Sequence, residues 1–442
     1  MIKYQFMKFS ILLAILLWGS FNTYAQNYES AADKVFEFIA NGQGDSIYTH
    51  FNEKIRARAT PETFNSIFHK LEERFGAYQS KGEWQRTAIE SQNMYYCDLV
   101  FKNSPLRLLV AFDPDGKVNT IRFIPVPHSA SVPVKNDKFS ESSIEIVSGK
   151  YKLPGTMSYP NKMTKAPVAI LVHGSGPNDR DETVGANKPF RDIAWGLADR
   201  GIAVIRYDKR TFIYGSKWKT VEKKGTFDDE TVDDAIAAIK WAKKNPQFDT
   251  NQIYLIGHSL GAMLAPRIAQ KAPELAGIIM LSGNARPLED VILDQVNYLS
   301  SLQDSSDKDK KQTTLIKEQI ANLKNLGTKK YDEKIGLPLN LSKAYWQFAE
   351  KYNQVKVAKK LKLPIFILQG ERDYQVTMTD FNMWRSSLKH NRNVTFKSYP
   401  KLNHLYQEGK GKSIPSEYAQ KASIPEYVIK DISQWIKDSD RK

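Results

Sequence analysis

The strongest constraint on the fold is a series of short apolar runs that alternate with amphipathic helical stretches. Strand-like runs lie at residues 168–172, 203–207, 253–256, 278–281, 365–368 and 394–399. Strands that are apolar on both faces are typical of a parallel sheet that helices cover on both sides. Residues 142–442 are therefore predicted to form an α/β architecture with a mostly parallel, doubly covered sheet. A leading β-hairpin is predicted at residues 144–152 and 155–159.

One interval interrupts this alternation. Residues 284–362 are charged and helical in pattern and contain no strand-like run. They are too long for an ordinary connection between two strands, so we predict a helical cap inserted there, and we call this segment the cap insertion. Its aromatic residues either face a substrate or form the core of the insertion itself: Tyr298, Tyr345, Trp346, Phe348 and Tyr352.

The N-terminal quarter of the chain has a different pattern. A chain of 442 residues is expected to form two or three folding units. Residues 26–126 begin with helical periodicity and continue with strand-like segments at 84–90, 94–101, 106–112 and 118–124. Helices followed by an antiparallel meander indicate a small α+β domain. Residues 127–141, rich in Pro, Ser and Lys, are predicted to be a linker.

The first 25 residues are typical of an export signal. Lys3 and Lys8 precede a short apolar run over residues 9–18, and small residues precede Gln26. We therefore expect a signal peptide over residues 1–25 and a secreted or periplasmic mature protein; a retained N-terminal anchor is the alternative. Because no later segment approaches about 18 uninterrupted apolar residues, no stable membrane insertion is expected after signal cleavage.

The single cysteine and the net charge limit the possible partners. Cys97 has no second cysteine with which to form an intramolecular disulfide or a metal cluster, and we expect it to be buried and inert. The formal charge is +15, and +7 of this excess lies in residues 304–362, with 14 Lys against 7 Asp and Glu. Such a surface attracts anionic substrates or polyanions, although a solvated lysine-rich helix face is the commoner explanation. The chain carries no recognisable nucleic-acid motif, so no nucleic-acid partner is predicted.

The sharpest chemical signal is the sequence GHSLG at residues 257–261. It directly follows the apolar run 253–256 and opens a helical stretch. A sharp turn from strand to helix exposes a serine hydroxyl, and the flanking glycines fit the crowded backbone of such a turn. We therefore predict Ser259 as a nucleophile.

A base and an acid are expected downstream, in the order Ser, Asp or Glu, His. His404 follows the last predicted strand, whereas His390 precedes that strand and has the pattern of a surface residue. Asp373 follows the strand at 365–368, with Glu371 and Asp380 as less favoured acids. The predicted set is Ser259, Asp373 and His404, in which the acid holds the imidazole in the required tautomer.

Two backbone N–H groups are needed to stabilise an oxyanion. One is expected from Leu260, which follows the nucleophile, and the other from Ser175 in the glycine-containing loop after the strand at 168–172. His173 and His258 each lie at a strand end beside glycine, and structural hydrogen bonding is the favoured interpretation for both.

Residues 173–181, HGSGPNDRD, resemble the oxyanion loop of bacterial α/β-hydrolases related to dienelactone hydrolases and serine aminopeptidase-like esterases. RYDKR at residues 206–210 and the GHSLG turn share this resemblance, which extends from about residue 142 to the C-terminus. The N-terminal domain resembles the small α+β module often placed ahead of such enzymes. The resemblance implies an α/β-hydrolase fold and carboxylic-ester hydrolysis with no cofactor.

Two departures from these relatives stand out. Dienelactone hydrolases proper use a cysteine nucleophile where this chain has Ser259. In the relatives a glycine usually follows the Asp-Lys-Arg run, whereas here residues 211–214 intervene before Gly215. In the oxyanion loop, Asp179, Arg180 and Asp181 are interpreted as a buried ion-pair brace, and substrate binding is the alternative.

The expected function is hydrolysis of a small-molecule ester through an acyl-enzyme intermediate. A serine peptidase or aminopeptidase and a thioesterase remain open on the same scaffold, because one triad serves several acyl groups. The net positive cap insertion argues mildly against an aminopeptidase, which needs acidic groups for a substrate ammonium. A binding protein with a vestigial hydrolase domain is the alternative from a different class.

Overall fold

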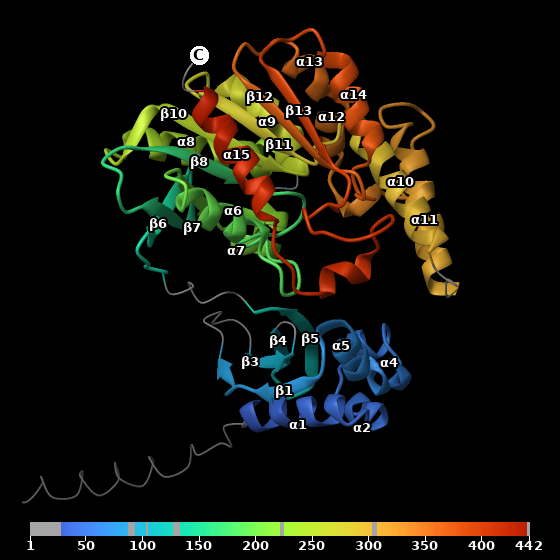
Figure 1. Cartoon of the computed structure of the whole chain (residues 1–442). Helices are drawn as coiled ribbons and strands as arrows, with labels where there is room; N and C mark the ends of the chain where they lie inside the picture. The colour runs from blue at the N-terminus through green and yellow to red at the C-terminus, as the bar shows by residue number, and fades with distance from the viewer. Residues whose placement is uncertain are drawn as a thin grey trace, which may run out of the picture. The chain divides into compact units, whose positions relative to one another are not determined.

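The computed structural model describes residues 28–86, 93–102, 105–126, 133–221, 225–302 and 307–439. The chain divides into two compact units, residues 1–127 and 128–442 (Figure 1). In the parts just named, no helix has the length and apolar character needed to cross a membrane. The predicted signal peptide, residues 1–25, lies outside the described residues.

The first unit packs helices against an antiparallel sheet with the strand order β1-β3-β4-β5, in which β2 also pairs with β3. Helix α1 (Tyr28–Ala40) lies across β3 and β4. Its Ala32, Val35, Phe36 and Ile39 are buried, as the periodicity predicts. The other helices are α2 (Gly44–Tyr48), α3 (Glu53–Arg56), α4 (Pro61–Asn65) and α5 (Ile67–Phe75), and the strands are β1 (Tyr78–Lys81), β2 (Gln85–Arg86), β3 (Asn93–Phe101), β4 (Leu106–Phe112) and β5 (Val118–Pro125).

Cys97 lies in β3 and is fully buried in the core of this unit. Burial raises the pKa of its thiol to about 12, so the reactive thiolate does not form at neutral pH. The structure thus agrees with the prediction of an inert cysteine.

The second unit contains an eight-stranded sheet in the order β13-β12-β11-β10-β8-β9-β7-β6. The pairs from β13 to β9 are parallel, whereas the hairpin β6–β7 pairs antiparallel with β9. The strands are β6 (Phe139–Ser148), β7 (Tyr151–Pro160), β8 (Ala166–Val172), β9 (Ala203–Tyr207), β10 (Phe248–His258), β11 (Gly277–Leu281), β12 (Ile365–Gly370) and β13 (Val394–Tyr399). The predicted α/β class and the mostly parallel sheet are confirmed.

Helices cover both faces of this sheet (Figure 1). In β8, Val168 and Ile170 join one apolar core with α8 (Asp233–Lys244) and α9 (Leu260–Lys271), while Leu171 joins the opposite core with α6 (Pro189–Ala198) and α15 (Glu426–Ser439). Successive side chains of a strand point to opposite faces of the sheet, and here both faces are buried beneath helices. This explains why the strands are continuously apolar in sequence.

Between β11 and β12 the chain forms the cap insertion, with α10 (Leu288–Ser301), α11 (Asp307–Leu323), α12 (Lys343–Lys351) and α13 (Gln354–Ala358). Trp346 packs in a small core of the insertion's own, whereas Tyr345, Phe348 and Tyr352 pack against the main core. Tyr298 contacts Tyr374, with ring centroids 5.2 Å apart.

The two ends of the cap insertion are joined at its base. Gln354 Nε2 donates to the carbonyl oxygens of Asn284, Ala285 and Arg286 at 3.2, 3.0 and 3.0 Å. Asp380 of α14 (Met378–Leu388) accepts from the backbone N–H groups of Ala285 and Arg286, both at 3.0 Å. The chain therefore leaves and re-enters the sheet layer at one hydrogen-bonded junction.

Several boundaries differ from the sequence-based expectations. The leading hairpin turns at Gly149 and Lys150, not at residues 153–154, and Gly149 has φ +58°, a conformation that glycine adopts at little cost. Strand β6 begins at Phe139, inside the segment predicted as a linker, and β1 was not predicted. Of the strand predicted at 84–90, β2 covers only Gln85–Arg86, and residues 87–90 lie outside the described part.

Candidate active site

Ser259 lies in the turn between β10 and α9. Its backbone has φ 52° and ψ −115°, which is a strained conformation for a residue with a side chain. The flanking glycines are needed for space: a Cβ on Gly257 would lie 2.3 Å from Gly261 O, and one on Gly261 would lie 2.2 Å from Val172 O. Ser259 N donates to Leu281 O at 2.9 Å, which ties the turn to the next strand. These contacts hold the hydroxyl at the carboxyl edge of the sheet.

Asp373 and His404 meet on the loops that follow β12 and β13. His404 Nδ1 lies 2.7 Å from Asp373 Oδ2, and both side chains are buried. Asp373 also accepts from the backbone N–H groups of Gln375 and Val376 at 2.7 and 3.0 Å, and from Gln369 Nε2 at 3.1 Å. The carboxylate is therefore fixed, and Nε2 of the imidazole is the nitrogen that can exchange a proton with a nucleophile.

The other candidates named from the sequence are engaged elsewhere. Glu371 is exposed and accepts from the Ser398 hydroxyl at 2.7 Å. Asp380 is fully buried and pairs with Arg286, 2.9 Å from its guanidinium. His390 is exposed at the end of α14. Among these residues, the structure brings only Asp373 and His404 together.

His258 connects the serine turn to the histidine loop. Its Nε2 lies 2.9 Å from His404 O, and the two imidazole centroids are 4.7 Å apart. Because His258 directly precedes Ser259, this contact holds His404 beside the turn that carries the candidate nucleophile. His173 Nε2 similarly lies 2.9 Å from Asp179 O. Both histidines thus have the structural hydrogen bonds expected from the sequence.

Glu182 is a buried residue of this site that the sequence analysis missed. Its Oε2 forms an ion pair with His258 Nδ1 at 2.8 Å, and its Oε1 accepts from Gly174 N at 2.6 Å. Burial alone lowers the pKa of His258, but Glu182 together with His404 O and Asp373 outweighs burial, and the net pKa is raised. Burial alone raises the pKa of Glu182, but His258 together with His173 and the Gly174 N–H outweighs burial, and the net pKa is lowered. The pair therefore favours its charged form and links three loops.

The loop after β8 runs directly against the serine turn. A Cβ on Gly174 would lie 3.2 Å from Ser259 Cβ, so this loop passes the candidate nucleophile at contact distance. Ser175, the next residue, is exposed, and Leu260 N lies at the first turn of α9, where the helix dipole favours negative charge. Both predicted oxyanion donors are therefore on segments adjacent to Ser259.

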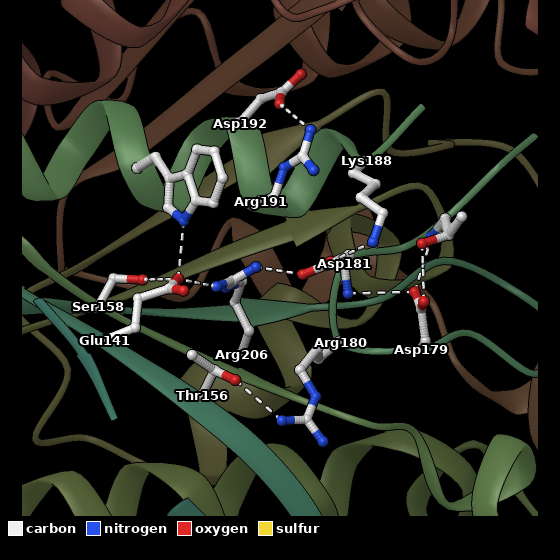
Figure 2. Close-up of polar contacts among 12 residues, drawn as sticks. Glu141, Thr156, Ser158, Asp179, Arg180, Asp181, Lys188, Arg191, Asp192 and Arg206 are labelled. Atoms are coloured by element: carbon white, nitrogen blue, oxygen red, sulfur yellow. Dashed lines mark hydrogen bonds and ion pairs between the residues drawn. The ribbon is translucent and has the colours of Figure 1, made fainter. Parts of the chain in front are cut away.

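A buried ion-pair network braces the far side of this loop (Figure 2). Arg180 pairs with Asp208 at 2.7 Å and also donates to Thr156 Oγ1 at 2.9 Å. Arg206 lies between the carboxylates of Asp181 and Glu141. Further members are Asp179, Thr183, Ser158, Lys188 and Trp195. Since the charges of Arg180 and Asp181 are satisfied within the fold, the brace interpretation agrees with the structure better than substrate binding does.

Comparison with known proteins gives two matching families. Residues 182–408 match the family described as serine aminopeptidase, S33. Residues 32–121 match a family described only as a protein of unknown function (DUF3887).

One curated relative is similar along almost the whole chain. Esterase EstD of Thermotoga maritima is 32% identical over 436 residues, which cover 97% of this chain and 98% of the relative.

Among solved structures, Est1E from Butyrivibrio proteoclasticus is 17% identical, with a TM-score of 0.45 over 68% of this chain and 99% of that one. An esterase of Pyrococcus furiosus is 19% identical, with a TM-score of 0.44 over 69% of this chain and 95% of that one.

Proposed function

Since the chain belongs to the serine aminopeptidase S33 family of α/β-hydrolases, we propose that it hydrolyses carboxylic esters of small molecules, with Ser259, His404 and Asp373 as its catalytic triad. The similarity to Esterase EstD over nearly the full length of both chains supports an ester rather than a peptide substrate. The contact between His404 and Asp373, beside the strained serine turn, is the observation that carries the proposal.

The reaction proceeds in two acyl-transfer steps. Ser259 Oγ attacks the ester carbonyl carbon while His404 Nε2 takes its proton, and the Leu260 and Ser175 N–H groups stabilise the oxyanion. The tetrahedral intermediate then breaks its bond to the alcohol oxygen, which receives the proton from His404. Water then attacks the carbonyl carbon of the acyl-enzyme while His404 Nε2 takes its proton. The second tetrahedral intermediate breaks its bond to Ser259 Oγ, which receives that proton from His404, and the acid leaves.

Asp373 serves this cycle without taking the proton. Its carboxylate holds Nδ1–H of His404 and stabilises the imidazolium that forms in each step. The backbone N–H groups and the amide that hold Asp373 keep the carboxylate in place while His404 changes charge.

The experiment compares the wild type with Ser259→Ala on matched substrates: nitrophenyl esters of graded acyl length, acyl thioesters and aminoacyl nitroanilides. We expect ester hydrolysis by the wild type and a loss of about 10⁴-fold or more in kcat in the variant. A fluorophosphonate probe should label the wild type only. Faster cleavage of nitroanilides would indicate a peptidase, and faster cleavage of thioesters a thioesterase. A wild type that neither turns over nor takes the label would indicate a binding protein.

The mature protein is proposed to act outside the cytoplasm, in the periplasm or the medium. The charged start, apolar run and small-residue site of residues 1–25 support export. N-terminal mass spectrometry of the protein from its native host should find Gln26 as the first residue, and an intact Met1 in the cytoplasmic fraction would contradict the proposal.

A further inference from the structure

A buried chain of hydrogen bonds connects the cap insertion to the loop beside Ser259. Tyr345 of α12 donates from its hydroxyl to Glu230 Oε2 at 2.8 Å. Glu230 Oε1 accepts from Lys209 Nζ at 2.6 Å, and Lys209 Nζ also donates to Gly174 O at 2.9 Å. We call Tyr345, Glu230 and Lys209 the cap relay. Its three side chains are buried.

The position of Gly174 O gives this chain a specific consequence. In a trans peptide the C=O of one residue and the N–H of the next are locked in one plane and point in opposite directions. No cis peptide bond occurs in the described residues. Fixing Gly174 O therefore fixes the direction of Ser175 N–H, the second oxyanion donor of the proposed function.

The peptide on the other side of Gly174 is held independently. In the peptide that joins His173 to Gly174, Gly174 N donates to Glu182 Oε1 at 2.6 Å. In the peptide that joins Gly174 to Ser175, Asn178 Nδ2 is a second donor to Gly174 O, at 3.2 Å. Because glycine has the widest choice of backbone conformations, these contacts restrict a loop that is otherwise free to turn. Of the two donors to Gly174 O, the Lys209 ammonium makes a stronger hydrogen bond than the neutral Asn178 amide, because its donor is charged.

Glu230 reaches its place through an uncommon backbone feature. It lies in η1 (Asp228–Val232), a single π-helical turn directly before α8. Such turns are rare and frequently occur at functional sites. On the cap side, the ring of Tyr345 packs on Phe227, with centroids 4.5 Å apart, so apolar contacts keep its hydroxyl over Glu230.

From this geometry we infer that Lys209 is a positioning residue for the oxyanion site: it aims Ser175 N–H at the reacting carbonyl oxygen, and Glu230 and Tyr345 hold it from the cap insertion. The inference rests on the proposed ester hydrolysis. An oxyanion donor acts mainly in the transition state, so losing the aim lowers kcat and leaves substrate binding nearly unchanged.

The test uses Lys209→Met/Glu230→Gln, which removes both charges and so leaves no unpaired buried ion. Loss of one oxyanion donor typically costs about 10²–10³-fold in kcat, and a misaimed donor is expected to cost about 10–100-fold. KM should stay within about twofold, and the affinity for a trifluoromethyl ketone, which forms a tetrahedral adduct, should fall by the same factor as kcat.

A matched control lies next to Lys209 in the sequence. Arg210 and Asp234 form a second buried ion pair, with Arg210 Nε 2.9 Å from Asp234, and neither has a contact with Gly174 among the described side-chain hydrogen bonds. Arg210→Met/Asp234→Asn should lower Tm comparably and leave kcat and ketone affinity at wild-type values. Equal losses of kcat in both double variants would reduce Lys209 to a structural role and overturn the inference.

Tyr345→Phe is the variant to use if the Lys209 double variant does not fold. It removes only the hydroxyl and keeps the contact with Phe227, and kcat should fall about two- to fivefold at constant KM as the relay loosens. Unchanged kcat and ketone affinity in Tyr345→Phe would then overturn the inference. The wild-type assay separates the two claims: a wild type without ester hydrolysis contradicts both, whereas an active wild type with unaffected relay variants contradicts this inference alone.

Discussion

The two units of the chain differ in what they bury. In the described part of the first unit the buried side chains are apolar, whereas the second unit buries carboxylates, guanidinium groups, a lysine and three histidines. Burying a charge costs free energy unless it is paired and hydrogen-bonded. In the second unit several of these pairs gather around the loop after β8, as Figure 2 shows for one side of it. Apolar packing is enough to build a unit, but directional charged contacts are used where a loop must keep one geometry beside Ser259.

The largest effect that we expect to distinguish the two units is a loss of kcat when Asp373 of the second unit is changed. Asp373→Asn should keep its oxygen on the backbone N–H groups of Gln375 and Val376 and turn its NH₂ toward His404. The imidazole then takes the wrong tautomer, and kcat should fall about 10⁴-fold with little change in Tm. Steady-state ester hydrolysis measures the loss.

The control for that variant comes from the first unit. Asp113→Asn changes a carboxylate that accepts from Asn52 and Asn119, and kcat should remain at the wild-type value. A comparable fall of kcat in both variants would contradict the assignment of Asp373.

The next effect is on stability. Arg206→Met removes the guanidinium between Asp181 and Glu141 and should lower the free energy of unfolding by about 3–5 kcal/mol, because both buried carboxylates lose this guanidinium and Asp181 keeps only Lys188. Urea unfolding measures this loss. The combined variant Arg206→Met/Asp181→Asn/Glu141→Gln should recover much of it. A combined variant no more stable than the single one would mean that packing, not charge, sets the loss.

A core substitution in the first unit provides the contrast. Leu108 is fully buried in β4, and Leu108→Ala should lower the free energy of unfolding by about 2–5 kcal/mol through a cavity. The kcat of the folded enzyme should not change. A loss of kcat without unfolding would show that the first unit contributes directly to turnover.

The smallest effect is the pH dependence of the Glu182–His258 pair. The pKa of His258 is raised above its ordinary value of 6.5, so its contribution to stability is complete below pH 6.5 and is lost as pH rises through the raised pKa. The pKa of Glu182 is lowered from 4.5, so its contribution is present above pH 4.5 and is lost in more acidic solution. The Tm difference between wild type and Glu182→Gln should therefore be largest between these values, at about 2 °C.

Glu182→Gln is a suitable probe because the amide oxygen can still accept from Gly174 N. Its Tm should be compared with that of the wild type by thermal unfolding from pH 4 to pH 9, since groups common to both proteins cancel in the difference. A Tm difference that stays constant across this range would rule out a charged pair.

The sequence was most informative for functional residues that lie just beyond the carboxyl ends of strands. Ser259, Asp373 and His404 each lie in the segment that follows a predicted strand, and parallel strands bring their carboxyl ends to one edge of the sheet. Local pattern is therefore enough to nominate them, although their catalytic roles stay a prediction.

The long-range charge pairs left no comparable signal. Glu182 and His258 are 76 positions apart in the numbering, and Lys209 meets Tyr345 only through Glu230. No periodicity relates residues on separate loops, so Asp179, Arg180 and Asp181 suggested a brace without showing its partners. The hairpin turn was predicted at residues 153–154 and lies instead at Gly149 and Lys150. Pro154 and Gly155 are the stronger local turn signal in the sequence, but both lie within β7.

The junction at the base of the cap insertion has a consequence for how such enzymes diversify. Gln354 and Asp380 close the point where the chain leaves and rejoins the layer of the sheet. Beyond that closed stem, α10 and α11 form a core of their own with Trp346, so their outer parts can lengthen or shorten without pulling on the strands below. The stem makes this part of the molecule modular, so homologous proteins can acquire new preferences for their ligands while one inherited framework is retained.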